Sequence, residues 1–190
     1  MADTPLTSTL FWTIYNANSN EIVYPLYRTV DQEKGWGRAV MDMLIDPELT
    51  VEQRLCVVNY IGWNNDGQHH FEELVDHYVK VQRYSSAKQA FAAMDGAMLT
   101  VFAYVRAMDD YYVVDDALRL ADEAVRRSPV SRAAAMVQAL IRGQQLTDDM
   151  TRWNDIYTAC HRVETNAKLN HDLSPAAVNA IMEYINGYAE

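Results

Sequence analysis

Residues that interrupt secondary structure are scarce in this chain. Its 190 residues include 7 glycines and 5 prolines, and most of them stand between runs with apolar residues at helical spacing. Short strands joined by tight turns need more of both residue types, so the scarcity favours a few long helices. The length suits one domain with its own core. We therefore expect an all-α fold, a single-domain bundle of about eight or nine helices over residues 1–190, with a possible subdivision near residues 94–96.

Cysteine is also scarce. Cys56 and Cys160 lie in helical patterns without the C-x-x-C spacing of a metal knot, which argues against a disulfide framework. Two free thiols are typical of a protein in a reducing cytoplasm. The first residues lack the basic start and the uninterrupted apolar run of a signal peptide. We therefore predict a cytoplasmic protein.

The most apolar stretch falls well short of the roughly 20 residues that span a bilayer. It covers residues 96–108, with apolar side chains all the way round a helix and Arg106 as its one charged residue. A helix with no polar face has to be buried. We predict that it is the central helix, against which the amphipathic helices on either side pack.

Basic residues are outnumbered, with 16 Lys and Arg against 26 Asp and Glu and a formal net charge of −10. This balance argues against nonspecific affinity for nucleic acid or anionic membranes, since both need excess positive charge. The acids are concentrated in the first part of the chain, where residues 1–80 contain 12 acids and 5 bases. The expected partner is therefore a protein with a basic surface, with no direct nucleic-acid binding and no membrane binding.

Capping signals mark the ends of the expected helices. Thr4-Pro5 combines an N-cap residue with proline at the first helical position, and Thr50 with Gln53 forms a capping box. Residues 21–34 fit either a short kinked helix or an irregular segment, because they hold Pro25. Besides a helix opened by Thr4-Pro5 and the one over 96–108, the expected helices run from the Gly35–Gly37 break to Ile45, from Thr50 to Gly62, from Gln68 to about Ala93, from Asp110 to Ser128, from Pro129 to Gly143, from Thr147 to about Asn170 and from Ser174 to Asn186.

One spacing is compatible with a metal site. His69, Glu73 and His77 stand four residues apart, so they share one face of the expected helix over 68–93. A helical metal-dependent enzyme that uses these three residues is one alternative function. That face also carries Asp76 and Lys80, so a solvated polar face is the simpler interpretation. The sequence has no H-E-x-x-H motif, no phosphate-binding loop and no catalytic signature, so we expect no cofactor and no enzymatic activity.

A second charge pattern lies between Asp109 and Glu123, where six acids accompany Arg119 alone. Three of the acids have an arginine four residues later, in the order that stabilises a helix. These expected pairs are Asp115 with Arg119, Asp122 with Arg126, and Glu123 with Arg127. Asp109, Asp110 and Asp116 have no such partner, so they are candidates for a contact surface.

Carboxylates spread along helices can imitate the phosphates of a nucleic acid and occupy a basic groove. The main hypothesis is an inhibitor or regulator that works in this way, such as a phage-type inhibitor of a host defence nuclease or RNA-guided complex, as in anti-CRISPR proteins. Simple solubility and a self-associating helical scaffold are the other interpretations of this surface. The expected partner-binding residues are Asp42, Asp46, Glu48, Glu72, Glu73 and Asp76, with Trp36 and Trp63 as anchors at predicted breaks, and Asp109, Asp110 and Asp116 as a second patch.

Overall fold

The helix α7 (Gly96–Asp109) is almost completely buried. It begins at Asp95, whose carboxylate accepts a hydrogen bond of 2.7 Å from the backbone N–H of Met98. Twelve of its 14 residues are buried, and the two exceptions are Ala97 and Arg106. The helix contacts α8, α4, α9 and α5. The buried helix that the sequence predicts over residues 96–108 is therefore confirmed.

The computed structural model describes residues 4–16, 28, 30, 35–62 and 68–189, and within them the fold is all-α, as the sequence predicts. Its helices pack in a single compact domain. None of the described helices is both long and apolar enough to cross a membrane. Besides α7, the elements are α1 (Thr13–Asn16), α3 (Arg38–Ile45), α4 (Val51–Ile61), α5 (His70–Gln82), α6 (Ala87–Ala93), α8 (Asp115–Arg127), α9 (Arg132–Gln144), α10 (Trp153–Glu164) and α11 (Pro175–Ile185), with 3-10 helices at Met150–Arg152 and Asn186–Tyr188.

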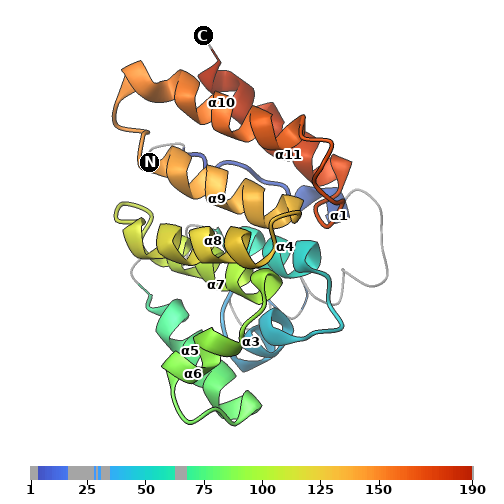
Figure 1. Cartoon of the computed structure of the whole chain (residues 1–190), viewed down its shortest axis with the longest axis vertical. Coiled ribbons are helices and arrows are strands. Elements are labelled where there is room, and N and C mark those ends of the chain that lie inside the picture. Colours follow the sequence, from blue (N-terminus) through green and yellow to red (C-terminus); the bar gives the residue numbers. More distant parts are fainter. Residues whose placement is uncertain (1–3, 17–27, 29, 31–34, 63–67, 190) are drawn as a thin grey trace.

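The helices are stacked in layers. α10 and α11 lie at one end of the molecule, α5 and α6 lie at the other, and α7, α8 and α9 lie between them (Figure 1). α7 and α8 approach very closely at Gly96. A Cβ atom at this position would lie 2.2 Å from Ser128 Oγ and 2.8 Å from the carbonyl oxygen of Ala124. Glycine is therefore required where these two helices meet.

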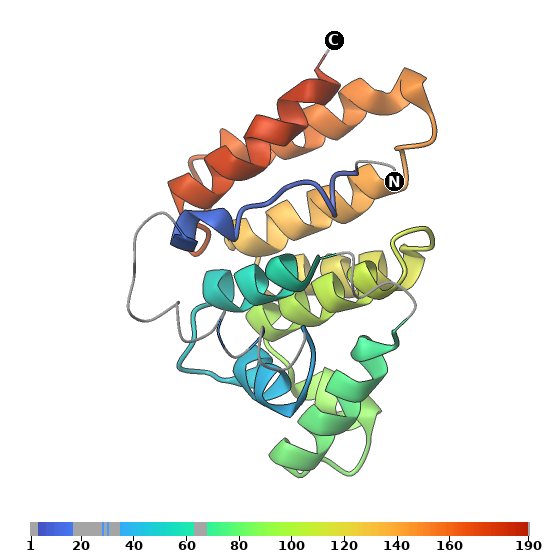
Figure 2. The ribbon, with the colours of Figure 1, turned by 180° about the vertical axis from the view of Figure 1, so that it is seen from behind.

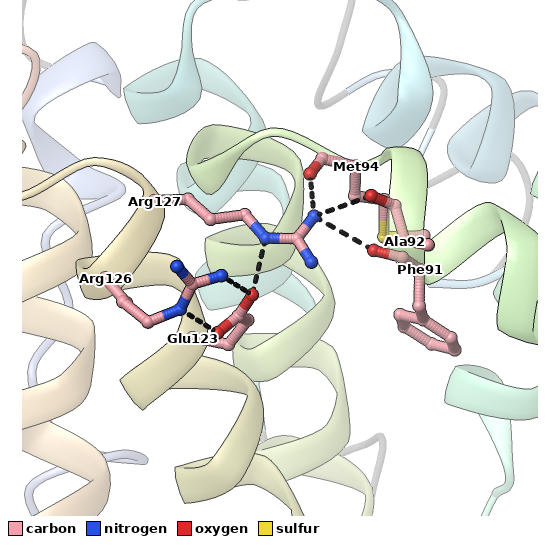
Figure 3. Close-up of polar contacts among 6 residues, drawn as sticks. All are labelled: Phe91, Ala92, Met94, Glu123, Arg126 and Arg127. Carbon is pink, nitrogen blue, oxygen red and sulfur yellow. Dashed lines mark hydrogen bonds and ion pairs between the residues drawn. The ribbon is translucent and has the colours of Figure 1, made fainter.

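Two arginines cap helices other than their own. Arg127 of α8 donates hydrogen bonds to the carbonyl oxygens of Phe91, Ala92 and Met94 at the end of α6 (Figure 3). Arg132 of α9 donates in the same way to the carbonyl oxygens of residues 164, 166 and 170, at and beyond the end of α10. The last carbonyls of a helix lack partners within it, so each arginine satisfies acceptors that water would otherwise bind.

The helix expected after Thr4-Pro5 is not formed, and this prediction was wrong. Residues 4–12 form turns that run along α9 (Figure 2), and only Thr13–Asn16 is α-helical. Thr4 Oγ1 accepts a hydrogen bond from the N–H of Thr7, while Thr9 Oγ1 donates to the carbonyl oxygen of Pro5. Such local bonds between side chains and backbone compete with helix formation.

Three further helices differ from those expected. The helix predicted from Asp110 begins at Asp115, because the carboxylate of Asp110 accepts from the N–H groups of Tyr112 and Val113 in a turn. The helix predicted over 68–93 is divided into α5 and α6, because Arg83 adopts a left-handed conformation with φ of 59° and Ser86 starts a new helix by accepting from the N–H of Gln89. The helix predicted from Thr147 to Asn170 is shorter. Asp149 rather than Thr147 provides the cap, and α10 ends at Glu164. The capping box at Thr50 and the Ser174-Pro175 start are confirmed.

Candidate functional site

α5 presents three of the predicted acids to solvent. Glu72, Glu73 and Asp76 are exposed, whereas Leu74 and Tyr78 on the opposite side are buried against the core. The two sides follow from the helical spacing of apolar residues. Glu72 and Glu73 lie in the first turn, where the helix dipole favours negative charge. Glu72 and Asp76, however, are like charges four residues apart, an arrangement that weakens an isolated helix.

Contacts from α3 extend this acidic side. His77 Nε2 lies 2.6 Å from Asp42 Oδ1, and the His77 side chain is 9% exposed while that of Asp42 is 53% exposed. Trp36, just before α3, donates from its indole Nε1 to Glu73 Oε2 over 3.0 Å. The structure thus brings Trp36, Asp42 and Glu73 together from two separate stretches of the sequence.

Arg106 connects the same side of α5 with α8. Its Nη1 lies 3.4 Å from Glu72 Oε1 and its Nη2 lies 3.8 Å from Asp116 Oδ2. The Arg106 side chain is 23% exposed, against 54% for Glu72 and 56% for Asp116. The guanidinium also lies over the ring of Phe71, 5.6 Å from its centroid. The positive charge is therefore more covered than the two carboxylates that it holds.

We call the resulting surface the acidic belt. Its carboxylates belong to Asp42, Glu72, Glu73, Asp76 and Asp116, and Trp36 lies among them. Three arginines form ion pairs with members of the belt, namely Arg38 with Asp42, Arg106 as above and Arg119 with Asp116. Five carboxylates against three guanidinium groups and the exposed Lys80, which lies four residues after Asp76 on α5, leave an excess of one negative charge.

A groove lies beside the belt between α5, α6, α7 and α8. It has a volume of about 310 Å³ and is lined by Phe71, Phe91 and Leu120 together with Glu72, Arg106, Asp116 and Arg119. The belt therefore has an apolar floor next to its charged groups.

Comparisons with models of known protein families, with curated proteins and with solved structures found no match to this chain.

The structure places the other predicted acids elsewhere. Asp46 lies at the end of α3, and its Oδ1 accepts from the N–H of Glu48 over 2.9 Å. Asp110 lies in the turn after α7, where its carboxylate accepts from the N–H groups of Tyr112 and Val113. Trp63 lies outside the described residues, as do most residues of the segment 21–34.

Asp109 was predicted to contribute to an exposed patch, and this prediction is wrong. Its side chain is 3% exposed, because it turns inward to the start of α5 and accepts a 2.6 Å hydrogen bond at Oδ2 from the N–H of Phe71. Its other oxygen, Oδ1, lies 3.8 Å from Nδ1 of His70. Burial raises the pKa of Asp109 to about 6.

His70 lies between Asp109 and Trp36, although no pattern in the sequence indicated it as a site residue. Its ring is stacked on the indole of Trp36, with centroids 4.2 Å apart and planes 10° apart. Burial lowers the pKa of His70. The sequence does not indicate whether His69 or His70 faces inward, because the direction of each side chain depends on the residue at which α5 begins.

The three candidate metal ligands do not converge. His69 precedes α5 in a left-handed conformation, with φ of 59°, and its side chain is 80% exposed. His77 faces Asp42, and Glu73 accepts from Trp36. Across the described residues, no group of three or more His, Cys, Asp and Glu side chains is placed to hold a metal ion. The expectation that His69 and His77 share one solvated helical face was wrong, because His69 lies outside the helix and His77 is covered.

Of the three ion pairs expected along α8, the structure contains one, between Glu123 and Arg127. Asp122 instead lies 2.9 Å from Arg142 of α9, and Arg126 pairs with Glu123. Arg119 pairs with Asp116, three residues earlier. Asp116 therefore has a partner within α8, although the i, i+4 spacing predicted none. Packing of α8 against α9 provides partners that spacing along one helix cannot show.

Proposed function

We propose that this protein binds, through the acidic belt, a basic and nucleic-acid-binding surface of another protein, and that it inhibits or regulates that partner by occupying the surface. The observation that carries the proposal is the set of exposed carboxylates on α3, α5 and α8 that contacts of His77, Trp36 and Arg106 connect. Such a surface would imitate the phosphates that the partner normally binds.

The belt is held in place before any partner arrives. His77 fixes Asp42, Trp36 fixes Glu73, and Arg106 lies between Glu72 and Asp116. Side chains that are already ordered lose less conformational freedom on binding, which favours affinity. Trp36 adds the type of aromatic residue that often anchors protein interfaces.

The chemistry favours an inhibitor of a host defence nuclease or RNA-guided complex, of the kind that phages produce, because such targets have basic grooves for nucleic acid. We place this activity in the cytoplasm. Cys56 and Cys160 are both free and buried, which suits a reducing compartment.

The test uses immobilised protein and a nuclease-treated cell extract, washed at increasing salt, with bound proteins identified by mass spectrometry. We expect the immobilised protein to capture a basic protein, which high salt releases and which the DNA or RNA that it normally binds displaces. The Glu72→Lys/Asp76→Lys variant should weaken capture by about tenfold or more, equivalent to about 1.4 kcal/mol, at a temperature at which circular dichroism shows the variant to be folded.

A control with the same change of charge comes from the far end of the molecule. Asp148 and Glu183 are exposed, Asp148 just after α9 and Glu183 on α11. The Asp148→Lys/Glu183→Lys variant should bind as the unmodified protein does. Equal loss in both variants would show that only net charge matters, and unaltered binding of the Glu72→Lys/Asp76→Lys variant would exclude the belt as the binding surface.

A further inference from the structure

Asp109 and His70 form a buried pair beneath the acidic belt. Asp109 ends α7, and its carboxylate caps the start of α5 by accepting from the N–H of Phe71 at Oδ2. No hydrogen bond from the described residues reaches its Oδ1, although this atom is buried. The nearest ring nitrogen, Nδ1 of His70, is 3.8 Å away, which is too long for a hydrogen bond.

The other side of the imidazole leads to the surface. The His70 ring is stacked on the indole of Trp36, and that indole donates to Glu73 of the acidic belt. His70 and Trp36 therefore lie between the buried carboxylate of Asp109 and the exposed carboxylate of Glu73. A movement of His70 toward Asp109 would shift the ring on which Trp36 is stacked, and the Trp36–Glu73 hydrogen bond would report that shift.

The charged groups that face the pair come from two helices. Glu72 and Glu73 lie on α5, and Arg106 lies on α7. Burial raises the pKa of Asp109 to about 6, and burial lowers the pKa of His70 from its usual value of 6.5. At neutral pH the pair therefore holds an ionised carboxylate and a neutral imidazole, and it gains a proton as the solution becomes mildly acidic.

We propose that His70 and Asp109 take up and share one proton on acidification, that this proton forms a hydrogen bond between Nδ1 and Oδ1, and that the stacked Trp36 ring carries the change to the belt. The proton comes from solvent, and the net charge of the pair changes from −1 to 0. The pair is thus a pH-sensitive element beneath the belt. Its consequence for partner binding rests on the proposed function, whereas the proton uptake itself does not.

The experiment follows the indole N–H resonance of Trp36 and the ring resonances of His70 by NMR between about pH 5 and pH 8, in the free protein. Trp36→Phe and His70→Gln assign the two sets of signals. Both are expected to follow one common midpoint near pH 6. In Asp109→Asn, which keeps an oxygen to accept from Phe71, the common step should disappear from the Trp36 resonance.

Two variants separate the pair from its neighbours. His69→Gln removes the adjacent histidine, whose side chain is 80% exposed, and should leave the Trp36 midpoint unchanged. Glu73→Gln removes the carboxylate that Trp36 contacts but keeps the pair. Because the negative charge of Glu73 raises the pKa of His70, the His70 step should persist in this variant with its midpoint at a lower pH. The proposal is overturned if the pH-dependent change of the Trp36 resonance persists in Asp109→Asn. It is also overturned if that change disappears in Glu73→Gln and in no other variant. Should Asp109→Asn fail to fold, the side-chain carboxyl carbon resonance of Asp109 in the unmodified protein decides the same question, because it should titrate with the midpoint of His70 and a different midpoint overturns the proposal.

A partner is absent from these titrations, so their failure is distinct from failure of the proposed function. If the titration behaves as expected and a partner is found, its affinity for the belt should depend on pH in the unmodified protein and not in His70→Gln.

Discussion

Nη1 of Arg127 on α8 lies 3.0 Å from the carbonyl oxygen of Phe91, so a residue of one helix closes the C-terminal end of another. Its neighbour Arg126 contacts the same carboxylate, Glu123, but differs in burial, with 70% of its side chain exposed against 24% for Arg127. Two adjacent arginines that share one partner therefore have different structural roles.

The first prediction compares these two arginines. Arg127→Leu should lower the free energy of unfolding by about 2 kcal/mol, because it leaves partly buried carbonyls of α6 without a charged donor. Arg126→Leu should cost far less, because an exposed ion pair contributes little to stability. Urea unfolding measures both. Similar losses in the two variants would contradict a capping role for Arg127.

The second prediction concerns the contact between α7 and α8. Gly96→Ala places a methyl group within 2.6 Å of Ser128 Cβ and 2.8 Å of a backbone oxygen, and backbone cannot move aside as a flexible side chain can. We expect a loss of about 2 kcal/mol in the free energy of unfolding. Gly187→Ala is the control, since a Cβ there meets no atom within 4 Å. Thermal or urea unfolding of the two variants tests the difference.

The third prediction concerns how the N-terminal segment is attached. Asn59, a buried residue of α4, accepts from the N–H of Trp12 and donates to the carbonyl oxygen of Thr9 and the hydroxyl of Tyr104. Asn59→Leu keeps the approximate volume but leaves these groups unpaired, so we expect a loss of about 3 kcal/mol.

Tyr104→Phe is the milder variant of the same network. It removes one hydroxyl while Asn59 keeps its two backbone contacts, and the expected loss is about 1 kcal/mol. Limited proteolysis should cut residues 4–16 faster in Asn59→Leu than in Tyr104→Phe. Equal rates of cleavage in these two variants and the unmodified protein would show that Asn59 does not hold the segment.

The fourth prediction is a pH dependence of stability. The pKa of Asp109 is raised from 3.8 to about 6 in the folded protein, so the folded state binds this proton more tightly than the unfolded chain does. The stability that this group contributes is fully present below pH 3.8 and is lost as the pH rises through about 6. From pH 4 to pH 7, the unmodified protein should lose up to about 3 kcal/mol relative to Asp109→Asn.

The opposite sign holds for His70. Its pKa is lowered on folding, so its contribution to stability increases as the pH rises toward 6.5. In Asp109→Asn this contribution should therefore dominate, and stability should increase with pH over the mildly acidic range. Unfolding by denaturant at a series of pH values tests both signs. A difference between the two proteins that does not vary with pH would contradict the assignment to Asp109.

Local signals were reliable where a short stretch of chain decides the structure. The capping box at Thr50 and the start at Ser174 depend on hydrogen bonds that span three residues, and both occur as predicted. The same kind of signal failed at Thr4. There the side chains of Thr7, Ser8 and Thr9 offered the backbone other local partners, and residues 4–12 packed along α9 instead.

The candidate site was only partly predictable. The exposure of Glu72, Glu73 and Asp76 could be predicted, because they lie on the side of α5 opposite its apolar residues. The proximity of Asp42 and Asp116 could not, because these residues belong to α3 and α8. Asp109 illustrates the limit most clearly. In sequence it belongs to a run of acids, yet it lies at the last turn of a buried helix and is needed to cap α5.

Three properties could be predicted from the order of the amino acids: the helical fold, the burial of most of residues 96–108, and the excess of acids over bases. These properties depend on composition and on spacing within one helix. The packing of the helices determines which acids share a surface, which arginine covers which carbonyl, and which of two adjacent histidines faces Trp36. Those relationships depend on how the helices are oriented against one another, and a difference of one residue in where a helix begins turns its side chains by about 100°.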